Sequence, residues 1–156
     1  MEISILFLPL IASIISGFFG KYIGDRNSEI LTSVFVSISA FLSIFVLYQV
    51  IVNQYEENIV IATWINSGSL DVNWSMLIDP LSAVMLVVVT SVSSLVHIYS
   101  IGYMSHDPHK PRFMAYLSLF TFAMLMLVTS DNFIQLFFGW EGVGLCSYFL
   151  IGFWFK

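Results

Sequence analysis

The segment from Asn132 to Phe155 is predominantly apolar for 24 residues and holds one acidic residue, Glu141, near its middle. As an α-helix it would be roughly 36 Å long, enough to cross a bilayer. Glu141 would lie about 13–14 Å from one end, deep in the hydrocarbon. A charge at that depth costs at least roughly 2.5–3.5 kcal/mol, so such acids usually face a protein interior or a wet cavity and handle ions or protons. The alternative is a protonated acid that only hydrogen-bonds two helices together.

The composition places the whole chain in a membrane. It is 58% hydrophobic and 10% charged, with a mean hydropathy of +0.91, whereas a typical soluble domain is about 25% charged. A net charge of −5 without a basic patch excludes a nucleic acid as partner. The single cysteine, Cys146, excludes an internal disulfide and a metal or iron–sulfur site built from cysteines of this chain. We therefore expect an integral membrane protein with the lipid bilayer around it.

Five apolar runs approach or reach the roughly 20 residues that a helix needs to span a bilayer. They cover about residues 3–19, 30–52, 80–102, 113–129 and 133–155. The first run lacks a basic flank before it and a cleavage pattern after it, so we expect a retained helix and not a signal peptide. The fold class predicted for residues 1–156 is an all-α membrane protein, a bundle of five transmembrane helices.

The segment between the second and third runs has a different period. Leu70–Met76 alternates apolar and polar residues, as a half-buried strand does, and Asn66–Ser69 supplies a turn before it. We expect a short β-hairpin at about residues 59–76, with one face on the bundle or on a neighbouring subunit. The alternative is an irregular interfacial loop anchored by Trp64 and Trp74.

The basic residues predict the orientation of the helices. With five spans they all fall on one side of the membrane: Lys21, Arg26, Lys110, Arg112 and Lys156. The positive-inside rule then puts the N-terminus outside and Lys156 inside. The sequence also indicates where two helices begin. Asp79 suits the N-cap of the third span and Pro80 its first helical position, and Asp131 or Asn132 can cap the last span.

Three histidines are further candidates for chemistry. His97 lies near the inner end of the third span, where it is either a proton relay or a partly wet residue at the level of the headgroups. His106 and His109 lie in the inner loop. We expect these histidines to be solvated and not to form a metal site, because the spacing of the possible ligands is loose. We expect no metal and no cofactor in this chain.

The run from Gly139 to Phe153 (GWEGVGLCSYFLIGF) resembles the signature of one family, the antiporter-like membrane subunit of respiratory complex I, NADH:quinone oxidoreductase chain 5 (chain L in bacteria). Shorter segments agree in the same order: Leu8-Pro9-Leu10, Asp79-Pro80-Leu81-Ser82, His97-Ile98-Tyr99 with Tyr103-Met104, Arg112-Phe113 with Ala115-Tyr116, and Asp131-Asn132. The resemblance covers the whole chain.

This resemblance implies a role for Glu141 as a proton-transfer acid that pairs with a lysine two helices further on. That lysine is absent, so the resemblance implies an N-terminal fragment or a truncated product, without a complete proton path across the membrane. It also implies other membrane-arm subunits as partners, NADH, FMN, iron–sulfur clusters and quinone in other subunits, and a location in the bacterial plasma membrane or the mitochondrial inner membrane. The alternatives are a subunit of a multisubunit sodium/proton antiporter and a purely structural membrane bundle.

Overall fold

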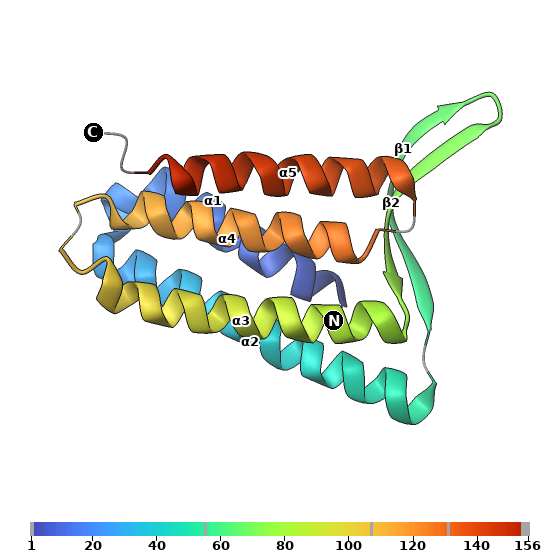
Figure 1. Cartoon of the computed structure of the whole chain (residues 1–156), viewed down its shortest axis with the longest axis horizontal. Coiled ribbons are helices and arrows are strands. Elements are labelled where there is room, and N and C mark those ends of the chain that lie inside the picture. Colours follow the sequence, from blue (N-terminus) through green and yellow to red (C-terminus); the bar gives the residue numbers. More distant parts are fainter. Residues whose placement is uncertain (1, 55, 107, 131, 154–156) are drawn as a thin grey trace.

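A computed structural model describes residues 2–54, 56–106, 108–130 and 132–153, with the side chains of Glu2 and Glu57 left out. It contains five helices and one hairpin between the second and third of them (Figure 1). The elements are α1 (Glu2–Ile23), α2 (Asp25–Asn53), β1 (Glu57–Ser67), β2 (Leu70–Ile78), α3 (Pro80–Tyr103), α4 (Lys110–Val128) and α5 (Phe133–Ile151). All five helices are long and apolar enough to cross a membrane. The predicted fold class is confirmed.

The helices extend further into polar sequence than the apolar runs indicate. Helix α2 begins at Asp25, five residues before the apolar run, because a helix continues wherever its backbone bonds are satisfied, whereas hydropathy marks only its apolar part. A turn at Gly24, with φ of 95°, separates α2 from α1. Helix α5 ends earlier than its apolar run, at Ile151.

Two predicted helix starts are present. The side chain of Asp79 accepts a hydrogen bond from Ser82 N at 2.7 Å, with Pro80 at the first helical position of α3. Asn132 caps α5 in the same way, because its Oδ1 accepts from Gln135 N at 2.7 Å. The other candidate cap, Asp131, lies outside the described residues.

The helices form a bundle in which α1 packs against α2 and α4, and α3 packs against α2. Helix α5 packs mainly on α4, at the edge of the bundle (Figure 1). The turn between α1 and α2 and the loop between α3 and α4 lie at one end, on the left of Figure 1. We call this the basic end, because it carries Lys21, Arg26, Lys110 and Arg112. The hairpin lies at the other end, which we call the hairpin end.

The predicted hairpin is confirmed, and the irregular-loop alternative is wrong. Its strands are antiparallel, with pairs running from Glu57↔Ile78 to Ser67↔Leu70 and two register shifts between them. Gly68 takes a φ of 61° in the turn, a conformation that glycine adopts without strain. The base of the hairpin lies across the helix ends, and its tip projects past α5 (Figure 1).

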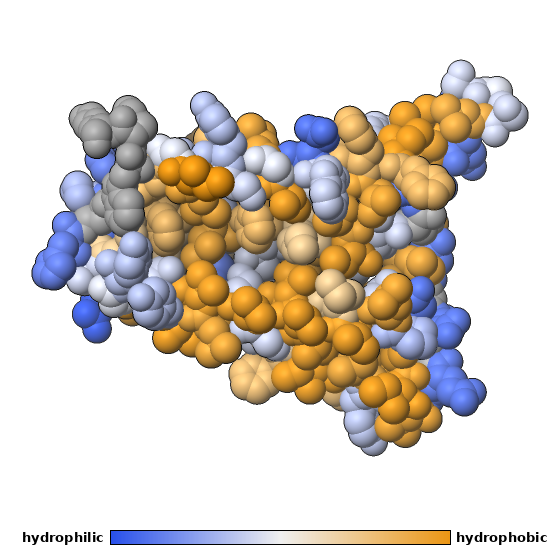
Figure 2. Space-filling view, viewed as in Figure 1, coloured by the Kyte–Doolittle hydropathy of each residue, from blue (hydrophilic) through white to orange (hydrophobic). Residues whose placement is uncertain are grey.

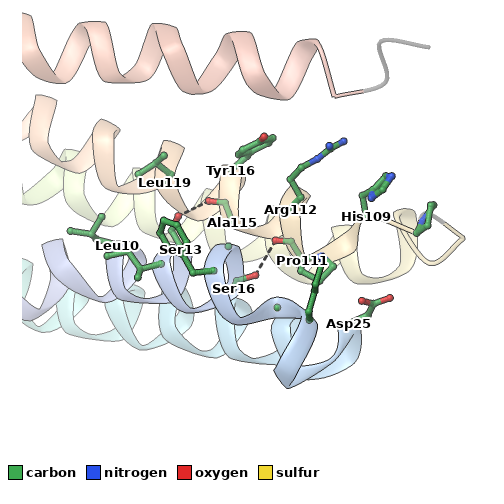
Figure 3. Close-up of a pocket in the computed structure, with 16 residues that line it drawn as sticks. Leu10, Ser13, Ser16, Asp25, His109, Pro111, Arg112, Ala115, Tyr116 and Leu119 are labelled. Atoms are coloured by element: carbon green, nitrogen blue, oxygen red, sulfur yellow. Dashed lines mark hydrogen bonds between the residues drawn. The ribbon is translucent and has the colours of Figure 1, made fainter.

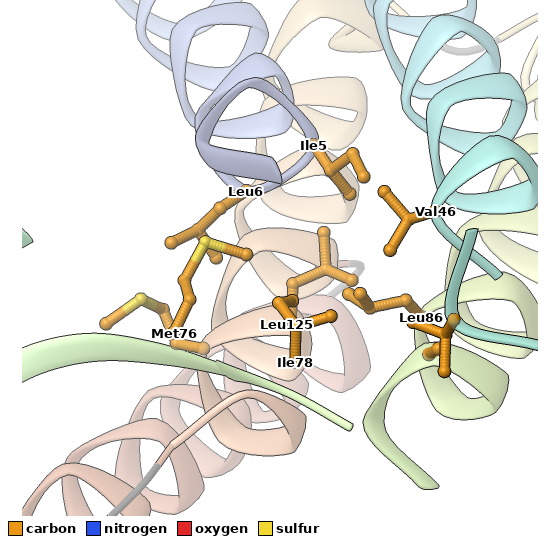
Figure 4. Packing of buried hydrophobic residues seen from close by; sticks show 10 residues of the cluster. Ile5, Leu6, Val46, Met76, Ile78, Leu86 and Leu125 are labelled. Carbon is orange, nitrogen blue, oxygen red and sulfur yellow. The ribbon is translucent and has the colours of Figure 1, made fainter. Parts of the chain in front are cut away.

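The main apolar core lies at the hairpin end (Figure 4). Ile59 and Ile61 of β1 pack against this core. Its buried members come from α1, α2, β2, α3 and α4, and they are Ile5, Leu6, Val46, Val50, Met76, Ile78, Ala83, Leu86, Leu125 and Met126. On the face of the bundle that Figure 2 shows, the flank is mostly apolar and the hydrophilic residues gather mainly at the two ends. This pattern is the one that a membrane-spanning bundle requires.

Candidate functional site

Glu141 is exposed on the side of α5 that faces away from α4. The buried residues of α5 are Gln135, Gly139 and Cys146, which share the face toward α4. The share of buried residues is 17% for α5, against 33–44% for the other helices, so most of α5 is uncovered. A small hydrophilic patch interrupts the apolar surface midway along α5 (Figure 2), and Glu141 is the one charged residue in that helix.

The residues around Glu141 on this face are those that helical spacing predicts from the sequence. Phe137, Gly144 and Tyr148 lie four residues before, three after and seven after Glu141, so they share its face. Phe137 and Tyr148 are exposed. Within the described part of the chain, no hydrogen bond or ion pair reaches the carboxyl of Glu141. The acid therefore stands on an open face, where another helix can supply its partner.

Gly139, Gly142 and Gly144, which lie close to Glu141 in the sequence, have two different packing roles. A Cβ at Gly139 would lie 2.9 Å from Leu127 Cα, and a Cβ at Gly142 would lie 3.2 Å from Ala123 Cβ, so both glycines let α5 approach α4 closely. A Cβ at Gly144 would meet nothing within 4 Å. Gly144 thus leaves bare backbone beside Glu141 on the open face.

His97 is fully buried between α3 and α4, with 0% of its surface exposed. The expectation of a partly wet residue at the headgroup level is wrong. Its Nδ1 lies 2.7 Å from Ser93 O, which can only accept, so Nδ1 carries a proton and donates. Its Nε2 lies 3.0 Å from Ser118 Oγ. Sequence reasoning placed the imidazole too close to the surface because it measured depth along one helix and not the cover from α4.

Hydroxyl groups continue this polar contact into the bundle. Ser93 Oγ hydrogen-bonds Thr121 Oγ1, between α3 and α4. Thr90 lies three residues before Ser93 in α3, and its Oγ1 lies 2.7 Å from Ser43 Oγ of α2. Each of these hydroxyls also has a backbone carbonyl or imidazole partner. Hydroxyl and imidazole groups, which can carry protons, therefore make part of the buried contacts between α3 and its neighbours α2 and α4.

Gln135 is a buried residue whose role the sequence did not reveal. Its side chain is 0% exposed and bonds the backbone of Ser75 twice, with Oε1 accepting from Ser75 N at 3.1 Å and Nε2 donating to Ser75 O at 2.7 Å. Asn132 adds a bond from Nδ2 to Asn73 O at 3.0 Å. These bonds fix β2 to the start of α5, so the hairpin and the helix of Glu141 are held together.

A groove of about 690 Å³ opens at the basic end between α1 and α4 (Figure 3). Ser13 and Ser16 of α1 bond the carbonyl oxygens of Ala115 and Pro111, both at 2.9 Å, and close its floor. His109 lines the groove and is exposed, as is His106 in the same loop. The described residues include no group of three or more His, Cys, Asp or Glu that could hold a metal ion.

Comparison with known proteins gives a consistent family. A profile described as NADH-Ubiquinone oxidoreductase (complex I), chain 5 N-terminus, matches residues 64–114. Proteins named NADH-ubiquinone oxidoreductase chain 5 are 57% identical over 155 residues in Arabidopsis thaliana and 54% identical over 153 residues in Phytophthora infestans. These matches cover 99% and 98% of this chain, and 23% of each relative.

The chain thus spans about a quarter of the length of the relatives that it matches. The fold is consistent with this match, because five membrane-length helices carry the aligned sequence. Over nearly its whole length the chain is therefore similar to one region of proteins named NADH-ubiquinone oxidoreductase chain 5.

Proposed function

We propose that this chain is part of a proton-translocating membrane subunit of NADH:quinone oxidoreductase and that Glu141 is its proton-transfer acid. The observation that carries the proposal is a lone carboxyl group midway along a membrane-length helix, on a face that the described chain leaves open. The enzyme in this proposal is the one after which the relatives are named, NADH-ubiquinone oxidoreductase. The chain takes part in proton transfer and not in electron transfer, so NADH, FMN, iron–sulfur clusters and quinone belong to other subunits.

The open face of α5 is proposed to contact another protein helix that carries a cation. More than three quarters of each relative lies outside the matched region, which leaves ample protein to cover this face. An acid exposed to hydrocarbon would be costly, whereas an acid beside a cation is favoured in its ionised form. When the cation moves away, the proton affinity of Glu141 rises and the acid takes up a proton. Repeated movement of the cation would load and unload Glu141.

His97 is proposed as a second proton-bearing group. Its neutral form accepts from Ser118 at Nε2, and its protonated form donates to the same hydroxyl after that hydroxyl turns. The site can therefore hold an extra proton without moving a heavy atom. His97 lies between α3 and α4, whereas Glu141 faces away from α4.

The basic end is proposed to face the inner side of the membrane, with the N-terminus outside. Four described basic residues share that end, and the positive-inside rule assigns it to the side of synthesis. The chain is further proposed to lie in a mitochondrial inner membrane or a bacterial plasma membrane, beside other membrane-arm subunits, and the names of the relatives support this location.

The test is Glu141→Gln in the assembled complex, with Glu141→Asp as the matched variant that keeps an acid. Protons moved per electron are measured in sealed vesicles, together with the amount of assembled complex. We expect Glu141→Gln to lower this ratio with assembly intact, and Glu141→Asp to keep part of it. An unchanged ratio in Glu141→Gln would favour the structural bundle, and pumping that requires sodium would favour the antiporter alternative.

A further inference from the structure

The interior of the bundle differs between its two halves. The hairpin end holds the apolar core that includes Val46 and Leu86. Directly beyond it, three and four residues further toward the basic end, Ser43 and Thr90 form a buried pair. From there to the basic end, the described helices bury many side chains that carry hydroxyl, imidazole or carboxyl groups: Ser13, Ser16, Ser28, Glu29, Thr32, Ser33, Ser39, Thr121, Ser118, His97 and Ser100.

Glu29 is the acid of this polar half, and it belongs neither to the site of Glu141 nor to the hydrogen-bond partners of His97. It lies four residues from the start of α2, about 6 Å along the helix. Only 5% of its surface is exposed. Its Oε1 is fully enclosed and has no hydrogen-bond partner, and the same is true of Ser28 Oγ and Ser33 Oγ on either side of it. Buried polar atoms are nearly always paired, so three unpaired ones within six residues indicate internal water.

The depths of the polar groups form a series. Measured from the basic end of each helix, Glu29 lies about 6 Å deep, His97 about 9 Å, Ser118 about 12 Å, and Thr90 about 20 Å. Helices α2, α3 and α4 contact one another pairwise. The series therefore runs between three packed helices and stops at the apolar core.

We propose that Glu29 is the mouth of a hydrated proton inlet that opens at the basic end, reaches His97, and is closed toward the hairpin end by the apolar core. The inlet equilibrates His97 with the aqueous phase at the basic end only. It rests on the proposed role of His97 as a proton-bearing group. Glu29 is a positioning and collecting residue, because it takes protons from water and touches no substrate.

The proton transfer balances through water. Hydronium from the inner phase protonates the Glu29 carboxylate, and the proton moves through bound water to Ser118 Oγ. The Ser118 hydroxyl gives its own proton to Nε2 of His97, at 3.0 Å, and is restored by the incoming one. His97 then carries one added proton, with Nδ1–H still bonded to Ser93 O at 2.7 Å.

The charges around Glu29 suit a group that changes its protonation. Lys110 of α4 acts on the carboxyl from across the helix contact, and Asp25 and Arg26 of α2 act on it from its own helix. In the described residues, α3 contributes no Asp, Glu, Lys or Arg, and its titratable groups near this end are His97, Tyr99 and Tyr103. Helix α1 contributes the exposed Lys21 near this end. No direct ion pair links Glu29 to Lys110, so the carboxyl is near a cation and free to bind a proton.

The test uses the assembled complex in sealed vesicles in which the pH of each side is set separately. We measure protons moved per electron for Glu29→Gln, Glu29→Asp and the control Glu56→Gln, which changes an exposed acid at the hairpin end. A collecting acid matters most when free protons are scarce. We expect Glu29→Gln to lower the ratio several-fold at alkaline inner pH and much less at acidic inner pH, whereas Glu29→Asp keeps most of the ratio.

Each other outcome overturns the inlet. A loss in Glu29→Gln that is the same at every inner pH would assign Glu29 a structural role. A loss that follows the outer pH would place the opening on the wrong side, and unchanged pumping would remove Glu29 from the path. The proposal for Glu141 fails separately, because it predicts a loss in Glu141→Gln at all values of inner pH.

Discussion

Replacing Gln135 with leucine removes the bonds that hold β2 to α5. Leucine has a similar volume but no polar atoms, so Ser75 N–H and Ser75 C=O each lose their side-chain partner in a position that is 0% exposed. A buried backbone group without a partner costs about 1–3 kcal/mol. The two groups together give about 2–6 kcal/mol of local destabilisation. The base of the hairpin should therefore open more often.

Hydrogen–deuterium exchange at the Ser75 amide measures this opening. A change of 1.4 kcal/mol is a tenfold change in an equilibrium constant, so exchange at Ser75 should accelerate by at least about tenfold in Gln135→Leu. Gln49→Leu, which removes a half-buried amide from α2, is the control and should leave Ser75 unaffected. Wild-type exchange at Ser75 in Gln135→Leu would refute the assigned role of the side-chain bonds.

Two further variants test the packing of α5. Gly139→Ala places a Cβ 2.9 Å from the backbone of Leu127, so we expect a loss of about 1–3 kcal/mol from overpacking, measured as a lower midpoint of thermal unfolding in detergent. Gly144→Ala meets nothing within 4 Å and should be neutral or slightly stabilising, since alanine favours helices; equal effects of both variants would contradict the α4–α5 contact. Asn132→Ala removes the N-cap of α5 and the bond to Asn73 O and should cost about 1–2 kcal/mol. A midpoint equal to that of the wild type would show that the cap contributes nothing.

The elements of the fold follow from local patterns in the sequence. Apolar runs of membrane length predicted all five helices, and a change of period to two residues predicted the hairpin. Asp79-Pro80 and Asn132 marked helix starts because a cap acts on its own first turn. These signals depend on neighbours within a few residues.

The site depends on contacts between distant residues, which such patterns do not encode. Gln135 bonds Ser75, which lies 60 residues away in the sequence. Glu29 immediately precedes the apolar run that begins at residue 30. Hydropathy therefore assigns it to the loop before the second helix, and its burial could not be predicted. The sequence located Glu141 along its helix, but the face that it occupies depends on which side of α5 packs against α4.

The most direct test of the central claim is infrared difference spectroscopy of the assembled complex during turnover. If Glu141 binds and releases a proton inside the membrane, the spectrum should contain a carboxylic acid carbonyl band that is absent in Glu141→Gln and shifted in Glu141→Asp. The same band at full strength in Glu141→Gln would show that another group carries the proton and would contradict the role assigned to Glu141.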